Sequence, residues 1–189
     1  MTNSLENRPK SSSGKFELRT VRPLKKLTIC EVFFILALMK ERIIITGYSG
    51  SLAQITKELL KDDYEIIGLT SNKEKVNNKD IYFWNTSTNE IDEKALENCK
   101  HIIHLAGYPI LKRWTKKNKR LMHQSRIGAT NILFNTCKNL NISPKTFISA
   151  SAIGIYGLNA RGVKSENDKI GNDWIARMVS DWEESAQKF

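Results

Sequence analysis

The chain has 189 residues, enough for one domain of ordinary size or slightly more. Apolar residues make up 40% and charged residues 26%, which excludes a disordered or fibrous protein. The formal charge is +10, but the basic residues are scattered among asparagines rather than gathered in one arginine-rich stripe, so we expect no nucleic-acid partner. The three cysteines are widely spaced, which argues against a disulfide framework and a zinc site; we expect no metal and a cytoplasmic location.

The first 38 residues differ from the rest. Residues 1–26 are polar, and 27–39 form a short apolar stretch interrupted by Glu31. This order resembles the start of a signal peptide, but no small-residue cleavage site follows, and the stretch is shorter than the roughly 20 residues of a membrane helix. We therefore interpret 1–38 as an extension outside the fold, with an N-terminal membrane anchor as the alternative, and 39–189 as one domain.

From residue 39 onward, strand and helix patterns alternate. The β-branched run at 42–46 is typical of a buried parallel strand, and Leu52, Ile55 and Leu59 recur at helical spacing. The expected strands are 42–46, 64–69, 81–84, 101–106 and 145–150, and the expected helices are 51–61, 91–98, 115–139 and 172–189. This alternation predicts an α/β fold, a Rossmann-like doubly wound parallel sheet with strand order 3-2-1-4-5.

The strongest local signal lies between the first strand and the first helix, at Gly47-Tyr48-Ser49-Gly50-Ser51-Leu52-Ala53. The first glycine permits a tight turn, the second lets the backbone approach a ligand, and the small alanine allows close packing of helix on strand. The helix N-terminus then aims free N–H groups at an anion. The pattern predicts a site for a dinucleotide pyrophosphate; the alternative is a plain strand-to-helix turn.

The end of the second expected strand bears on the choice of cofactor. An acidic residue there would accept from the ribose 2′-hydroxyl of NAD, whereas a basic residue would accommodate the 2′-phosphate of NADP. Residues 69–73 contain no acid, Ser71 lies among them, and Lys73 and Lys75 could pair with a phosphate. The cofactor is therefore NADP or NAD, and the sequence favours NADP.

Several segments resemble the extended short-chain dehydrogenases/reductases, and more narrowly the SDR39U1-like epimerases of the NAD-dependent epimerase/dehydratase family. Besides the glycine turn, they are His104-Leu-Ala-Gly-Tyr-Pro-Ile110, Lys112-Arg-Trp-Thr115, Ser125-Arg-Ile-Gly-Ala-Thr130, Ile148-Ser-Ala-Ser-Ala-Ile-Gly-Ile-Tyr-Gly157, Gly171-Asn-Asp-Trp174 and Asp181-Trp-Glu183. They occur in the family's order from Met39 to Phe189.

The resemblance implies a set of site residues. Leu105, Ala106 and Gly107 fall on the segment that passes under the cofactor, and Ser125 falls where extended members carry an active-site asparagine. Ser151 matches the family's catalytic serine or threonine, with Ser149 beside it. A hydroxyl there would bind the substrate oxygen whose proton leaves as hydride moves.

The chain also departs from the family. The Tyr-x-x-x-Lys pair is missing, because its positions hold Ile175 and Val179; Tyr156 could substitute as an acid, or could simply pack in its loop. Family members continue through further strands and a substrate-binding part, so we expect a sheet that is truncated at its C-terminal side. Either the chain is a fragment, or an oligomeric partner supplies the missing part. The resemblance implies an NAD(P)-dependent epimerase or reductase acting on a small molecule such as a nucleotide sugar; the alternative is a non-catalytic NAD(P) sensor or scaffold, or an inactive fragment.

Overall fold

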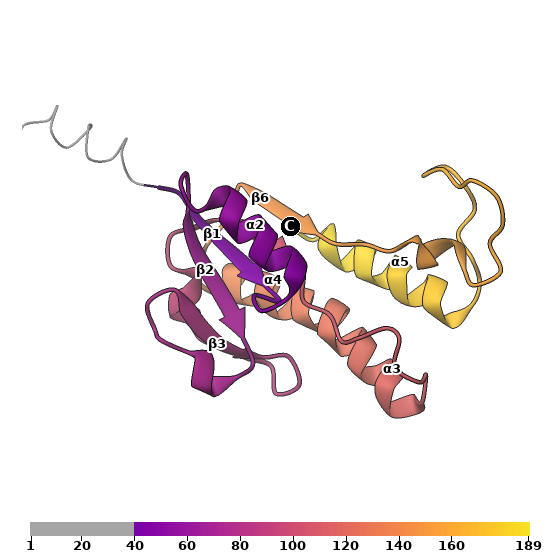
Figure 1. Ribbon diagram of the computed structural model, residues 1–189, viewed down its shortest axis with the longest axis horizontal. Helices are drawn as coiled ribbons and strands as arrows, with labels where there is room; N and C mark the ends of the chain where they lie inside the picture. Colours follow the sequence, from indigo (N-terminus) through magenta and orange to yellow (C-terminus); the bar gives the residue numbers. More distant parts are fainter. Residues whose placement is uncertain (1–39) are drawn as a thin grey trace, which may run out of the picture. The chain divides into compact units, whose positions relative to one another are not determined.

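The computed structural model describes residues 40–189 (Figure 1). The interpretation of 1–38 falls outside the described residues. The strands are β1 (Arg42–Thr46), β2 (Glu65–Thr70), β3 (Ile81–Asn85), β4 (Glu90–Ile91), β5 (Cys99–His104) and β6 (Thr146–Ser149). The α-helices are α2 (Ser51–Leu60), α3 (Lys116–His123), α4 (Ala129–Asn139) and α5 (Trp174–Ala186).

The sheet within residues 40–189 has the order β4-β3-β2-β1-β5-β6. Strand β1 pairs in parallel with β2 and β5, β2 with β3, and β5 with β6. The predicted Rossmann-like order of the parallel strands is therefore confirmed. Because successive side chains of a strand point to opposite faces, each strand contributes to two cores.

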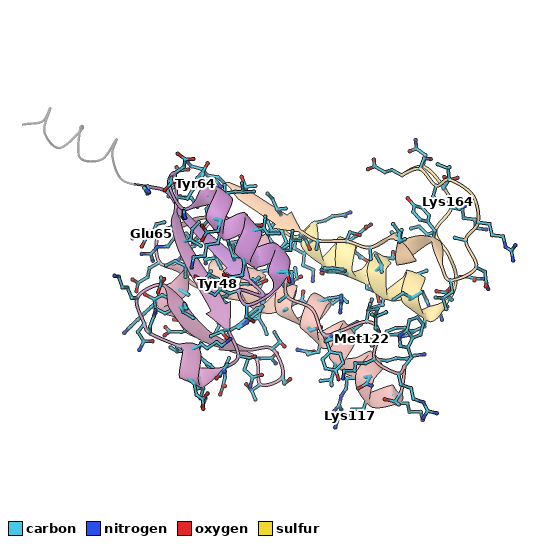
Figure 2. All side chains as sticks on the ribbon, in the orientation of Figure 1. Tyr48, Tyr64, Glu65, Lys117, Met122 and Lys164 are labelled. Atoms are coloured by element: carbon cyan, nitrogen blue, oxygen red, sulfur yellow. The ribbon has the colours of Figure 1, made fainter. Side chains whose placement is uncertain are left out.

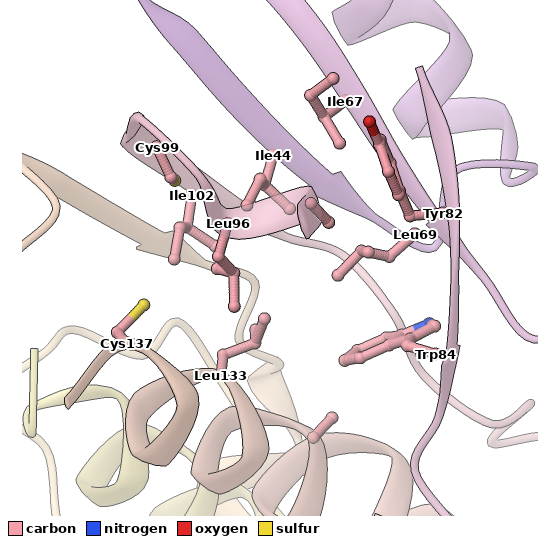
Figure 3. Close-up of a cluster of buried hydrophobic side chains, with 12 residues drawn as sticks. Ile44, Ile67, Leu69, Tyr82, Trp84, Leu96, Cys99, Ile102, Leu133 and Cys137 are labelled. Carbon is pink, nitrogen blue, oxygen red and sulfur yellow. The ribbon is translucent and has the colours of Figure 1, made fainter. Parts of the chain in front are cut away.

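On one face, α4 covers a core that contains Ile44 of β1, Ile67 of β2 and Ile102 of β5, three neighbours across the sheet (Figure 3). On the other face, α2 covers Ile43 and Ile45 of β1 (Figure 1). Since both faces of β1 are buried, this strand reads as a continuous apolar run. Its C-terminal end therefore has a fixed position, and the glycine turn begins there.

A third apolar cluster joins α3 and the segment after it to α5. Met122 and Ile127 pack with Ile175, Met178 and Trp182, and Met122 is fully buried. Figure 2 labels Met122 on α3. The predicted helix 115–139 is a chain of helical segments, because a π-helical turn, Gln124–Gly128, connects α3 to α4.

The short helix expected for 91–98 is present only as a 3₁₀ turn. Glu90–Ile91 forms the short strand β4, antiparallel to β3, and Glu93–Leu96 forms one 3₁₀ turn. The Asp92 carboxylate accepts a hydrogen bond from the Lys94 N–H and so starts the turn. Pairing with β3 thus overrides local helical spacing. Within residues 40–189, no helix has the length and apolar character to cross a membrane.

Candidate functional site

The turn after β1 requires glycine at its first position. Gly47 has φ +66°, and a Cβ there would come 3.0 Å from backbone atoms of Leu105 and Ala106. The Gly50 N–H closes the turn by donating to the Gly47 carbonyl oxygen at 2.8 Å. The turn is therefore held between its own hydrogen bond and the segment that follows β5.

The N-terminus of α2 has no side-chain cap. Gly50 is its N-cap residue, and no acceptor within residues 40–189 meets the N–H groups of Ser51, Leu52 and Ala53. In contrast, the Thr115 hydroxyl caps α3 and the Asp173 carboxylate caps α5. Free N–H groups and the partial positive charge of a helix N-terminus favour an anion at this position.

The opposite wall is the segment Leu105–Gly107, which the Thr46 side chain holds. Thr46 Oγ1 accepts hydrogen bonds from the N–H groups of Leu105 at 3.1 Å and Ala106 at 3.0 Å. It also lies 2.7 Å from Nδ1 of His104. Because both lone pairs of the hydroxyl are used, its hydrogen points to Nδ1, and the neutral ring carries its proton on Nε2.

His104 is completely buried, and burial lowers its pKa from 6.5 to about 4. The neutral ring is the form that can accept from Thr46. Its Nε2 is buried and has no hydrogen-bond partner within residues 40–189. The ring therefore acts in the structure as a buried acceptor for Thr46.

These walls enclose a cleft of about 250 Å³ at the carboxyl ends of the central strands. Its lining comes from the glycine turn, the ends of β2 and β3, the segment after β5 and the π-helical turn: Gly47, Tyr48, Ser49, Leu69, Thr70, Ser71, Trp84, Asn85, Thr86, Ser87, Ala106, Gly107 and Ser125. In doubly wound sheets this crevice is where dinucleotides bind.

The cleft contains seven of the predicted cofactor-binding residues: Gly47, Tyr48, Ser49, Ser71, Ala106, Gly107 and Ser125. Gly50, Ser51, Leu52, Ala53 and Leu105 build the turn, the helix start and the wall behind it but do not line the cleft. Sequence reasoning missed the lining from 84–87 at the end of β3. The signal was present, since β3 is parallel to β2 and its carboxyl end must reach the same edge.

The proposed catalytic side chains lie outside this cleft. Ser149 and Ser151 line a separate hollow, where the Ser151 hydroxyl donates to the Glu183 carboxylate. The Tyr156 hydroxyl donates to the Ser165 carbonyl oxygen at 2.9 Å. The structure therefore brings the two serines together but does not bring them, or Tyr156, to the cleft lining.

The positions of the missing Tyr/Lys pair are part of the core. Ile175 is 5% exposed and Val179 is fully buried, both in the cluster that joins α5 to α3. Neither side chain can transfer a proton, and neither lines the cleft. The chain thus has apolar packing where an acid–base pair would be expected.

A second hollow of about 250 Å³ adjoins the cleft and shares Tyr48, Ser49 and Thr70 with it. Lys75 also lines this hollow, whereas the Lys73 ammonium lies 5.2 Å from the ring centre of Phe83. The structure therefore places one of the two candidate lysines beside the cleft. Within residues 40–189, no group of three His, Cys, Asp or Glu side chains could hold a metal ion.

Comparison with known proteins identifies the family. The profile of the NAD dependent epimerase/dehydratase family matches residues 43–174. The chain belongs to this family. An epimerase family protein of Staphylococcus aureus (strain MRSA252) is 34% identical over 148 residues, which cover 77% of this chain and 49% of the relative. The 189-residue chain thus spans about half the length of the curated relatives that it matches.

Solved structures show the same fold. Human epimerase family protein SDR39U1 (isoform 2), crystallised with NADPH, is 18% identical with a TM-score of 0.61, over 77% of this chain and 48% of that one. A nucleoside-diphosphate sugar epimerase from Corynebacterium glutamicum is 26% identical with a TM-score of 0.61, over 79% and 31%. UDP-glucuronic acid 4-epimerase from Bacillus cereus, with UDP-glucuronic acid and NAD, is 19% identical with a TM-score of 0.60, over 76% and 50%.

Proposed function

We propose that this epimerase-family chain binds a nicotinamide dinucleotide in the cleft and serves hydride transfer at a carbonyl or alcohol carbon of a small molecule. The observation that carries the proposal is the glycine turn closed against Leu105–Gly107, with the uncapped start of α2 beside it. The pyrophosphate would lie against the N–H groups of Ser51 and Leu52. When bound, the cofactor supplies the hydride chemistry.

We propose NADP as the preferred cofactor. The end of β2 presents Thr70 and Ser71 and no carboxylate that would repel a 2′-phosphate. Lys75 lines the hollow next to that strand end and would bring a positive charge to the phosphate. The solved neighbours bind either nucleotide, NADPH in human SDR39U1 and NAD in the Bacillus cereus UDP-glucuronic acid 4-epimerase, so the proposed preference rests on the charges at this strand end.

A nucleotide sugar is the substrate class that one neighbour's name and another neighbour's bound ligand support. In this proposal Ser151 would polarise the substrate oxygen, as the family resemblance implies. Since its hydroxyl donates to Glu183 and lies outside the cleft lining, it would have to exchange that partner for the substrate. A Ser151→Ala variant that retains full turnover would remove Ser151 from the mechanism.

The absence of the Tyr/Lys pair favours a second candidate, a dinucleotide-binding module without catalysis. Buried Ile175 and Val179 leave α5 with no proton-transfer group at those positions. The two candidates share the cofactor and differ in turnover. Oxidation of bound NADPH on addition of 4-keto UDP-sugars, or reduction of bound NADP+ on addition of UDP-sugars, would decide for the enzyme, and binding without either reaction would decide for the module.

The decisive experiment is a titration of the full chain with NADPH and NADH, followed by nicotinamide fluorescence. We expect NADPH to bind about tenfold more tightly than NADH, because one charge-assisted hydrogen bond between Lys75 and the 2′-phosphate contributes a binding free energy of that size. Lys75→Ala should remove the preference, and Lys79→Ala, an exposed lysine in the same loop, is the matched control. Failure to bind either nucleotide would overturn the proposed function.

A further inference from the structure

We propose that Arg126 is a positioning residue that fixes the cleft wall for the nicotinamide half of the cofactor. This inference rests on the proposed function. The adenosine half would lie at the ends of β2 and β3, so the part of the cleft made by Gly107 and Ser125 is left for the other half. Arg126 lies directly behind that part and does not line the cleft.

Two consecutive residues of the π-helical turn hold Tyr108, the residue that directly follows the wall. The Ser125 hydroxyl accepts from the Tyr108 N–H at 2.7 Å, and Arg126 Nη1 donates to the Tyr108 carbonyl oxygen at 3.1 Å. Nη1 also donates to the Met122 carbonyl oxygen at 3.2 Å, which ties it to α3. π-Helical turns recur at functional sites, and here the turn lets neighbouring side chains reach the same peptide segment.

The guanidinium lies close to two further residues, Gly107 and Trp182. A Cβ on Gly107 would come 2.9 Å from Arg126 Nη2 and 3.0 Å from Cζ, so the plane of the group rests against a residue without a side chain. Its Cζ lies 5.1 Å from the ring centre of Trp182 on α5. Arg126 thus connects the wall, the π-helical turn and α5, and its planar fork leaves room for the close approach of Gly107.

Stability alone does not account for a cation here. Arg126 is half-buried, burial lowers its pKa, and within residues 40–189 no carboxylate lies within ion-pair distance of it. A partly buried charge with no counter-ion costs desolvation energy that a packed apolar side chain would avoid. The neutral state of His104 comes from its burial and not from Arg126, since burial is the main cause that lowers the pKa of that ring.

The wall is consequently fixed from both ends. Thr46 holds the N–H groups of Leu105 and Ala106, and the Ser125–Arg126 pair holds Tyr108. Gly107 lies between the two anchors, on the cleft surface. Loss of the Arg126 contacts would free the Gly107 end of the wall while the Thr46 end stays in place.

The test separates the two halves of the cofactor. NADPH and 2′,5′-ADP, which is the adenosine half alone, are titrated into the wild-type chain and into Arg126→Met and Arg126→Lys. We expect the Kd for NADPH to rise about tenfold in both variants, because lysine keeps the charge but loses the planar fork. The Kd for 2′,5′-ADP should stay within about twofold of wild type. Arg177→Met is the matched control, since Arg177 is exposed on α5 and contacts the Asn172 carbonyl.

Each outcome is decisive. If the wild-type chain binds neither ligand, the proposed function fails and the inference with it. If wild type binds both but the variants bind NADPH normally, or lose NADPH and 2′,5′-ADP in parallel, the positioning role of Arg126 is overturned while the proposed function stands. Should Arg126→Met fail to fold, Arg126→Lys carries the same comparison. Loss confined to NADPH supports the inference.

Discussion

A single methyl group at position 47 would test the geometry of the turn. Gly47→Ala places a Cβ 3.0 Å from backbone atoms of Leu105 and Ala106 and also strains a residue with φ +66°. Backbone cannot move aside as a flexible side chain can, so we expect a loss of about 2–3 kcal/mol in unfolding free energy and no measurable NADPH binding. Urea unfolding and nucleotide titration measure the two effects.

Gly162→Ala is the matched control for Gly47→Ala. Gly162 has φ +72°, but nothing lies within 4 Å of a Cβ built there. It should therefore show only the strain of the left-handed backbone, about 1–2 kcal/mol, and unchanged NADPH binding. Equal loss of binding in the two variants would mean that the close approach to Leu105 and Ala106 is not what shapes the cleft.

His104 gives the protein a specific dependence on pH. Burial lowers its pKa from 6.5 to about 4, so between these values the unfolded chain binds a proton that the folded chain does not. Stability should therefore fall as the pH drops from about 6.5 to about 4, by a total on the order of 3 kcal/mol, and should not depend on this group above that window.

The measurement is the unfolding free energy in urea at several pH values. His104→Asn keeps an amide oxygen that can accept from Thr46, and its pH profile should be flatter than that of wild type. His123→Asn, at an exposed histidine, should keep the wild-type profile. A His104→Asn profile parallel to wild type would show that the buried ring is not the titrating group.

At the scale of elements, the start of α5 depends on Asp173. Its carboxylate accepts from the Ala176 N–H at 2.9 Å and the Leu158 N–H at 2.8 Å, and these backbone donors lower its pKa. Asp173→Ala should lower the thermal midpoint by roughly 2–4 °C through loss of the cap. Asp181→Ala, exposed on the same helix, should leave the midpoint unchanged in the same melting experiment; equal shifts would contradict the capping role.

The elements also show what the sequence can and cannot predict. Strand β1 and Gly47 were predictable because a β-branched run and a required backbone conformation are local properties. Helix α2 was predicted from the spacing of Leu52, Ile55 and Leu59, yet these side chains are 59–74% exposed, and Ala53 faces the sheet. Periodicity established the helix but not its buried face, because the close approach of α2 to β1 admits only a small residue.

The candidate site, like the helix, was predictable where a local sequence pattern determines it and not where packing does. The turn and Leu105–Gly107 follow one strand each, so their chain positions already imply the cleft. Trp84 and Asn85 were missed although the predicted strand order already placed β3 beside β2, and this pairing brings the end of β3 to the cleft. The contact of Ser151 with Glu183 depends on how α5 packs, and no local pattern encodes that packing.

For the whole molecule, the formal charge of +10 should strengthen the binding of anionic ligands. Raising the salt concentration from about 0.1 M to about 1 M shortens the screening length from about 10 Å to about 3 Å. We expect the Kd for NADPH to rise several-fold over this range, and more than the Kd for NADH, because the 2′-phosphate adds negative charge that Lys75 would meet at short range. The measurement is a fluorescence titration at each salt concentration, with sucrose as the uncharged control. Equal salt dependence for the two nucleotides would mean that the positive field acts on the pyrophosphate alone and that Lys75 does not contact the 2′-phosphate.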